Sequence, residues 1–247
     1  MPWTTETIGG RPAAVFEPTR AAEPQRAVLY LHGHGGKTLD ASPAYTAQLE
    51  RHGLFAVCPS GGRSWWLDVV YDEFHSEQTP LAYLQQTVVP WIAERWDIRP
   101  PAIGLFGISM GGQGVLQLAY RRPIEFPVVV ALSPAIDFHM LYGQGLAIDR
   151  MFPDAEAARQ ETALLRIQGL NWPADQFLAC DPADDIWFPG VERLAGKLAS
   201  SGIPFEKDFE TSRGGHCWEY FDAMAPRVVG FLAERTETAL RRLPLAR

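Results

Sequence analysis

Residues 107–111, with the sequence GISMG, match the pattern G-x-S-x-G, in which a serine between two glycines can act as a nucleophile. The pattern follows the apolar run 103–106 and precedes a stretch with helical spacing, 110–121. A serine at such a strand-to-helix turn is strained, and side chains two positions before and after it would collide with neighbouring backbone. We therefore expect Ser109 to attack a carbonyl group, the alternative being an ordinary glycine-rich turn.

A serine hydroxyl needs a base at neutral pH, and His216 is the candidate. Of the six histidines, only this one follows a late strand and a loop, in the sequence RGGHCWEYF before the last helical stretch. Chains that use G-x-S-x-G at such a turn carry their catalytic residues in the order Ser, acid, His. We expect His216 to accept the proton of Ser109, the alternative being a loop histidine without a role.

The acid should follow the apolar run 176–180, where the sequence ACDPADDIW contains three aspartates. Asp181 directly follows the run and could cap the next turn, and Asp185 lies beside a hydrophobic step. Asp184 is three residues into the loop, which gives it the reach to meet a histidine on the next loop. We expect Asp184 to orient His216 and to stabilise its protonated form, with Asp181 and Asp185 as the alternatives.

Acyl transfer also needs hydrogen-bond donors for the negative charge that develops on the carbonyl oxygen. The sequence LHGHGG, residues 31–36, follows the first buried run, where a loop of this kind contributes one backbone N–H. We expect the N–H groups of His34 and Met110 to form this oxyanion hole. His32 and His34 also resemble a pair of metal ligands, but no third ligand lies nearby in the sequence, so we expect no metal.

Four further side chains are candidates for substrate contact. Trp65 and Trp66 lie in the loop after the second buried run, where they could line a pocket or serve as packed anchors. His32 could contact substrate or brace its own loop, and His139 could contact substrate or pack within an insertion. In the tryptophan loop, Arg63 could bind an anionic group, although an ion pair with a nearby aspartate is the alternative.

Composition restricts the class of protein. The chain has 247 residues, 47% of them apolar and 21% charged, as in ordinary globular proteins. Its net charge of -7 disfavours a nucleic acid or an anionic membrane as the main partner. No apolar run has the roughly 18 residues that a membrane span needs, and no secretion signal is recognisable, so we expect a cytoplasmic protein. Three widely spaced cysteines are expected to be reduced thiols.

Strand-like and helix-like segments alternate along the chain, which predicts an α/β fold with a mostly parallel sheet and helices on both faces. Short apolar runs predict buried strands at 27–31, 55–58, 103–106, 128–132 and 176–180. Helical spacing covers residues 43–52, 81–95, 110–121, 191–201 and 226–240. Alternating segments predict an opening hairpin at 4–8 and 13–17 and a strand near a sheet edge at 204–211.

One long region interrupts this alternation, at about 134–172, and contains a helical piece around 154–166. Such an insertion beside the sheet could form a small cap over a pocket or a plain surface excursion. The chain shows no internal repeat and no linker. We therefore expect a single domain over residues 1–247, with this insertion as part of it.

Taken together, Ser109, Asp184 and His216 in this order, with LHGHGG upstream, make the chain resemble the α/β-hydrolase superfamily over nearly its whole length. Within it, GLFGISMGGQGVLQLAYRRP and GGHCWEYF are similar to the putative-esterase family that includes esterase D, S-formylglutathione hydrolase, feruloyl esterase domains and mycolyltransferases. CPSGGRSWW is similar to a Pro-x-Gly-Gly loop in some members. Ile108 and Asp181 differ from the residues that many relatives carry at these positions.

The resemblance implies a serine carboxylesterase or thioesterase that works through an acyl-enzyme, without a metal or organic cofactor, on a small-molecule substrate. The short insertion predicts a moderately open cleft for a small or medium acyl group. An acyltransferase with the same triad and a non-catalytic binding protein on the hydrolase fold are the alternatives. Peptidase activity is a weaker one, because nothing in the chain resembles the propeller or large cap of oligopeptidases.

Overall fold

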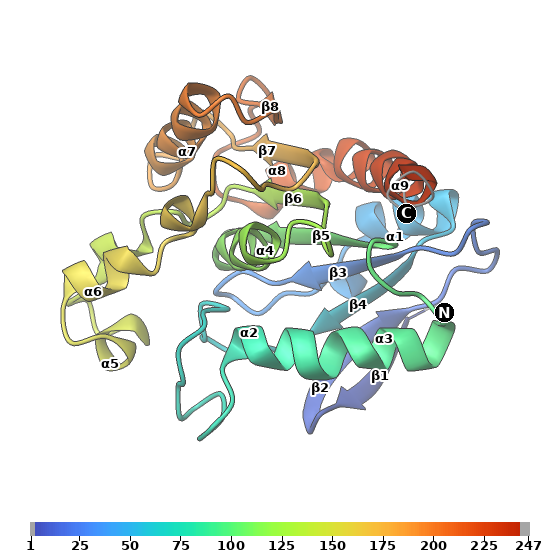
Figure 1. Cartoon of the computed structure of the whole chain (residues 1–247), viewed down its shortest axis with the longest axis horizontal. Helices are drawn as coiled ribbons and strands as arrows, with labels where there is room; N and C mark the ends of the chain where they lie inside the picture. The colour runs from blue at the N-terminus through green and yellow to red at the C-terminus, as the bar shows by residue number, and fades with distance from the viewer. Residues whose placement is uncertain (1–2, 243–247) are drawn as a thin grey trace.

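The computed structural model describes residues 3–242, and its strands form one mixed sheet in the order β1-β2-β4-β3-β5-β6-β7-β8 (Figure 1). The first two strands form the predicted antiparallel hairpin, β2 is antiparallel to β4, and all other neighbouring pairs are parallel. The predicted class, α/β with a mostly parallel sheet, is confirmed. The strands are β1 (Trp3–Ile8), β2 (Arg11–Phe16), β3 (Ala27–Leu31), β4 (Phe55–Pro59), β5 (Ile103–Ile108), β6 (Val128–Leu132), β7 (Asp175–Ala179) and β8 (Glu206–Asp208).

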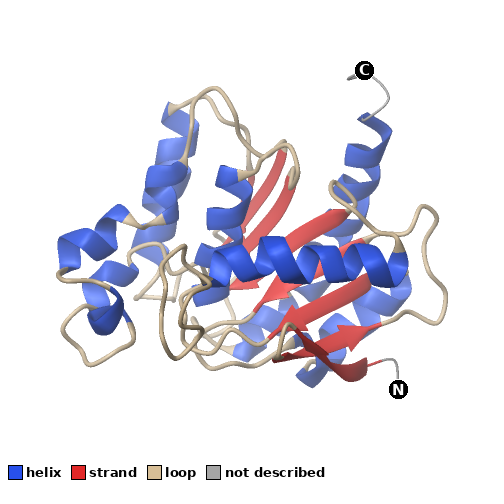
Figure 2. Cartoon of the chain, turned by 60° about the horizontal axis from the view of Figure 1, so that its bottom comes forward, coloured by secondary structure: helices blue, strands red, loops and turns tan. Residues whose placement is uncertain are grey.

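Helices cover both faces of the sheet (Figure 2). Successive side chains of a strand point to opposite faces, so Leu29 and Leu105 belong to one apolar core while Tyr30 and Phe106 belong to the other. The first core contains side chains of α2, α3, α4 and α7, and the second contains side chains of α1, α8 and α9. The α-helices are α1 (Pro43–His52), α2 (Pro80–Tyr83), α3 (Val89–Trp96), α4 (Met110–Arg121), α5 (Ile148–Met151), α6 (Ala155–Gln160), α7 (Phe188–Ser200), α8 (Trp218–Ala223) and α9 (Ala225–Arg242).

Two helices predicted as continuous are interrupted, and two short helices are not predicted. The stretch expected at 81–95 is α2 and α3 joined by a π-helical turn, Leu84–Val88. Pro90 has no N–H to donate and its ring crowds the preceding turn, which disfavours a regular α-helical ladder there. The piece expected around 154–166 is α6 followed by a 3₁₀ turn, Ala163–Arg166. The two unpredicted helices are α5, which lies in the insertion, and α8, which directly follows the loop of His216.

The order of the strands determines where a site can form. The chain leaves β3 to form β4 on one side of it and returns to form β5 on its other side. In a parallel sheet, ligands bind beyond the carboxyl ends of the strands at such a switch point. The loops after β3 and β5 therefore meet at this edge, and those after β7 and β8 leave the same edge.

The insertion at 134–172 lies along the outer side of α4 (Figure 1). Gln113 of α4 accepts a hydrogen bond from the backbone N–H of Ala163 at 2.9 Å, and the Gln117 amide donates to the carbonyl oxygen of Glu161. The ring of Phe138 packs against Trp65 with 5.2 Å between the ring centroids. Polar side chains of a buried helix thus fasten the insertion beside the sheet.

Candidate active site

The elbow holds Ser109 between the end of β5 and the start of α4. Its backbone has φ 58° and ψ -119°, outside the regions that non-glycine residues favour. The surrounding chain fixes this conformation, because the Ser109 N–H donates to Leu132 O at 2.9 Å and its carbonyl accepts from Ala135 N at 3.0 Å. The serine is thus presented at the edge of the sheet by a rigid turn.

The two glycines of G-x-S-x-G have no space for a side chain. A Cβ atom on Gly107 would lie 2.1 Å from the carbonyl oxygen of Gly111, and one on Gly111 would lie 1.8 Å from the carbonyl oxygen of Leu31. Since atoms cannot approach this closely, only glycine fits at either position. The steric reason predicted for both glycines is confirmed, with β3 and the first turn of α4 as the obstacles.

The structure brings His216 and Asp184 together from the loops after β8 and β7. His216 Nδ1 lies 2.6 Å from Asp184 Oδ2. The Asp184 side chain is buried, while 29% of the His216 side chain is exposed. Asp184 also accepts from Trp187 N at 3.1 Å and lies 3.8 Å from the thiol sulfur of Cys180. Burial raises the pKa of that thiol to about 12, so it is a neutral donor to the carboxylate.

Asp181 is buried like Asp184, but its carboxylate faces the loop of His216 and not the imidazole. It accepts from Ala183 N at 2.8 Å, which makes the predicted turn cap. It also accepts from the Ser212 hydroxyl at 2.7 Å, from Arg213 N at 2.6 Å and from Gly215 N at 2.9 Å. Burial opposes ionisation of Asp181, but these hydrogen bonds outweigh it and lower its pKa below the ordinary value.

The loop after β3 lies directly against the elbow. A Cβ atom on Gly33 would lie 3.2 Å from Ser109 Cβ and 3.3 Å from the carbonyl oxygen of Ile108. His34 follows Gly33 and lines the same cavity as Ser109. Met110 is the first residue of α4, and the first N–H groups of a helix have no partner within the helix. Both backbone donors considered in the sequence therefore lie beside the serine.

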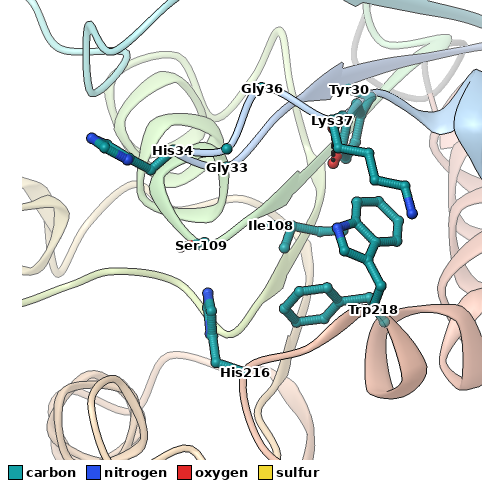
Figure 3. A pocket seen from close by; sticks show the side chains of 11 residues that line it. Tyr30, Gly33, His34, Gly36, Lys37, Ile108, Ser109, His216 and Trp218 are labelled. Atoms are coloured by element: carbon teal, nitrogen blue, oxygen red, sulfur yellow. Dashed lines mark hydrogen bonds between the residues drawn. The ribbon is translucent and has the colours of Figure 1, made fainter.

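A cavity of about 240 Å³ opens beside Ser109, and Figure 3 shows the His216 ring directed from below toward the serine. The Ser109 hydroxyl and the His216 imidazole, both within the described residues, line this cavity without a direct hydrogen bond between them. Its remaining wall is largely apolar and aromatic. Beyond the glycine loop of 33–36, the wall is formed by Tyr30, Lys37, Ile108, Trp218 and Phe221.

These wall residues were not among the predicted site residues. Trp218 and Phe221 are three residues apart on α8, so they lie on one face of that helix, next to His216 in the sequence. The aromatic spacing in HCWEYF could have indicated them. Tyr30 and Ile108 lie within buried strands, and no sequence signal separates them from ordinary core residues.

The four side chains considered for substrate contact lie outside this cavity. His32 is 1% exposed, accepts from Gly61 N through Nε2 at 2.9 Å, and has its pKa lowered by burial, so it braces the loop as a neutral ring. Trp66 is buried, and its indole donates to His32 O at 3.1 Å. Trp65 is buried beside Phe138, and His139 borders a different cavity within the insertion.

Within residues 3–242, no three His, Cys, Asp or Glu side chains gather as a metal site would require. No helix in the described part of the chain is long and apolar enough to cross a membrane. The three cysteines are free thiols.

The parallel sheet, the strained serine at the switch point and the late histidine loop define an α/β-hydrolase. The chain belongs to the family described as "Putative esterase", whose model matches residues 8–231. It is therefore an esterase-type serine hydrolase. No match was found among the curated proteins.

Solved structures share the fold at low identity. Fluorophosphonate-binding serine hydrolase F of Staphylococcus aureus has a TM-score of 0.77 at 16% identity, over 94% of this chain and 99% of its own. An S-formylglutathione hydrolase from Agrobacterium tumefaciens has a TM-score of 0.73 at 17% identity, over 95% of this chain and 94% of its own. A ferulic acid esterase has a TM-score of 0.73 at 16% identity, over 94% of this chain and 97% of its own. These similarities cover nearly the whole α/β-hydrolase fold.

Proposed function

We propose that this protein hydrolyses a carboxylic ester or thioester through an acyl-enzyme formed on Ser109, with His216 as the base and Asp184 as the acid. One observation carries the proposal: the His216 ring, 2.6 Å from the buried Asp184 carboxylate, faces a cavity that also contains Ser109. A nucleophile, a base and a group that orients the base are the three elements of this chemistry.

In the first half of the reaction, His216 Nδ1–H donates to Asp184, which leaves Nε2 free to accept the serine proton. Ser109 Oγ bonds to the carbonyl carbon as that proton moves to Nε2. The tetrahedral intermediate then collapses, the bond to the leaving oxygen or sulfur breaks, and the leaving group takes the proton from His216. The acyl group remains on Ser109 as an ester.

In the second half, water replaces the leaving group. His216 accepts a proton from water as the hydroxide oxygen bonds to the acyl carbon, and the Ser109 ester bond breaks as the proton returns to Oγ. The 29% exposure of the His216 side chain supports access of water to this position. We propose hydrolysis over transfer to an alcohol on this basis, and product analysis with added alcohols distinguishes the two.

The backbone N–H groups of Met110 and His34 are the proposed donors to the oxyanion. Met110 N–H belongs to the first turn of α4, so the partial positive charge at the helix N-terminus adds to the donor. The position of Gly33 against Ser109 supports a donor from the following residue. Preorganised donors of this kind stabilise negative charge as it develops on the carbonyl oxygen.

Labelling with a fluorophosphonate probe tests the proposal. We expect the wild-type protein to be labelled, Ser109→Ala to be unlabelled, and Ser200→Ala, a change in an exposed serine of α7, to be labelled like the wild type. Ester hydrolysis should fall by about 10⁴-fold or more in Ser109→Ala. Absence of labelling in folded wild-type protein would support a non-catalytic binding protein, and labelling that persists in Ser109→Ala would place the nucleophile elsewhere.

A further inference from the structure

The cavity beside Ser109 contains one cationic side chain, that of Lys37, among the residues that line it within the described chain. Its ammonium nitrogen lies 3.8 Å from the ring centroid of Trp218. Lys37 forms no ion pair with any carboxylate of residues 3–242. Figure 3 shows it on the opposite side of the cavity from Ser109, with Ile108 and Trp218 between them.

The position of this lysine is fixed by its surroundings. The Lys37 carbonyl oxygen accepts from the Tyr30 hydroxyl at 3.3 Å, which ties the backbone of the loop to β3. The face of the Trp218 ring attracts the ammonium group. An ammonium group has three donors, and an aromatic face satisfies none of them as a carboxylate would. The cation is therefore held in place while its hydrogen-bonding capacity stays available.

The charge of Lys37 is opposite in sign to the net charge of the protein. The protein carries a net charge of -7, so its overall field repels anions. Between the serine and the lysine, Ile108, Trp218 and Phe221 provide an apolar wall, and the cavity is small, about 240 Å³. A ligand that matches this arrangement has a reactive carbonyl at one end, a short apolar middle and an anionic group at the other end.

We propose that the cavity binds a short acyl chain that ends in a carboxylate, with the Lys37 ammonium group as its partner. The substrate class is then the half-ester, or half-thioester, of a short dicarboxylic acid. The inference depends on the proposed function, because it requires that Ser109 attack the carbonyl at the other end of the chain. Lys37 determines specificity and takes no part in bond breaking.

The experiment compares mono-4-nitrophenyl glutarate with 4-nitrophenyl pentanoate, which has the same chain length and no charge. Rates are corrected for spontaneous hydrolysis, measured with Ser109→Ala. We expect kcat/KM to be about tenfold higher for the glutarate at low ionic strength, and the difference to shrink with added salt. In Lys37→Met, which keeps an unbranched flexible side chain and removes the charge, kcat/KM for glutarate should fall about tenfold or more, mainly through KM.

Two variants serve as controls. Lys37→Arg keeps the charge and should retain most of the preference for glutarate. Arg51→Met removes an exposed cation of α1 that also forms no ion pair among the described residues and that does not line the cavity. We expect Arg51→Met to change both rates by less than about twofold, the scale of an exposed surface charge.

The results separate the inference from the proposed function. Hydrolysis of both esters at equal efficiency, or an equal loss for both in Lys37→Met, would overturn the anionic acyl site and leave the esterase proposal standing. A second result would also overturn the placement of the anion on the acyl side: Lys37→Met lowers kcat/KM for 4-carboxyphenyl butyrate, whose charge lies on the alcohol side, and leaves kcat/KM for the glutarate ester unchanged. Failure to hydrolyse either ester, together with absence of fluorophosphonate labelling, would overturn both proposals.

Discussion

The elbow after β5 and the paired loops after β7 and β8 position their side chains by different means. At the elbow, backbone atoms approach so closely that Gly107 and Gly111 have no room for a methyl group. In the paired loops, the carboxylate of Asp181 holds the chain around Ser212–Gly215 by hydrogen bonds, and Asp184 orients the imidazole of His216. The conformation of the elbow is determined by steric exclusion, and that of the paired loops by hydrogen bonds.

The difference has a consequence for substitution. A steric constraint has no partial solution, since any side chain at Gly111 displaces the backbone of β3. A hydrogen-bonded loop can lose one acceptor and keep its fold, because water and neighbouring groups replace part of the interaction. Side chains added at the two elbow glycines should therefore destroy the fold together with activity. Changes in the paired loops should reduce activity, and the loss should be greater the closer the carboxylate lies to the imidazole.

The largest effect is expected for Gly111→Ala. Because a Cβ atom there would lie 1.8 Å from the carbonyl oxygen of Leu31, the change should cost at least about 4 kcal/mol of unfolding free energy or prevent folding. Urea unfolding measures this. The matched control is Gly196→Ala in α7, where no atom lies within 4 Å of the added methyl group and a gain of up to about 1 kcal/mol is expected. A midpoint for Gly111→Ala equal to that of the wild type would contradict the steric account.

Asp184→Asn should have the next largest effect, on activity and not on the fold. An amide at this position favours the wrong tautomer of His216 and cannot stabilise its protonated form, so kcat should fall by about 10²- to 10⁴-fold. Steady-state kinetics and circular dichroism measure the two properties. A loss smaller than about fivefold would show that the imidazole does not depend on this carboxylate.

Asp181→Asn should have an intermediate effect. The amide cannot replace both acceptor oxygens, so the loop of His216 should loosen and kcat should fall about tenfold with KM nearly unchanged. The Asp181 carboxylate has a lowered pKa in the folded protein, so its stabilisation is present at neutral pH and is lost as the pH falls through that value. The variant should therefore be less stable than the wild type at pH 7, with a difference that narrows below about pH 4.

Unfolding measured against pH distinguishes this account of Asp181 from a purely local turn. If the difference in stability between wild type and Asp181→Asn stays constant as the pH falls, the carboxylate charge is not what holds the loop. If kcat is unchanged while stability falls, Asp181 supports the fold without positioning His216.

The smallest effect is expected for Asp185→Asn. This side chain is exposed, and it forms no hydrogen bond or ion pair within residues 3–242. Activity should remain within about twofold of the wild type and stability within about 0.5 kcal/mol. The same assays used for the other two aspartates measure both. A hundredfold loss here would identify Asp185 as the acid in place of Asp184.

Much of the architecture could be predicted because it follows from local patterns. Continuous apolar runs between turn residues predicted β3 to β7, and helical spacing predicted α1, α4, α7 and α9. The interruption before Pro90 and the short helices α5 and α8 were not predicted. The interruption depends on a single absent N–H group in an otherwise regular pattern, and the two helices, of four and six residues, are too short to establish a period.

Predictions of substrate-contacting residues were less successful, and for a physical reason. Trp65, Trp66 and His32 were candidates because large and polarisable side chains often line pockets, yet all three side chains are buried in the protein interior. Whether an aromatic side chain faces a cavity or the core depends on the packing of several segments at once. Sequence patterns do not contain that information.

By itself, the sequence determined the elbow and the order of the candidate residues Ser109, Asp184 and His216, because a serine between two glycines after a buried strand matches the turn G-x-S-x-G and a parallel sheet puts successive loops at one edge. Only the tertiary structure decided which contacts each of the three neighbouring aspartates makes. Asp184 lies against the imidazole of His216, Asp181 accepts hydrogen bonds from the loop that carries His216, and Asp185 is exposed to solvent. Their chemistry is identical, so only the direction of each side chain in the folded chain distinguishes them.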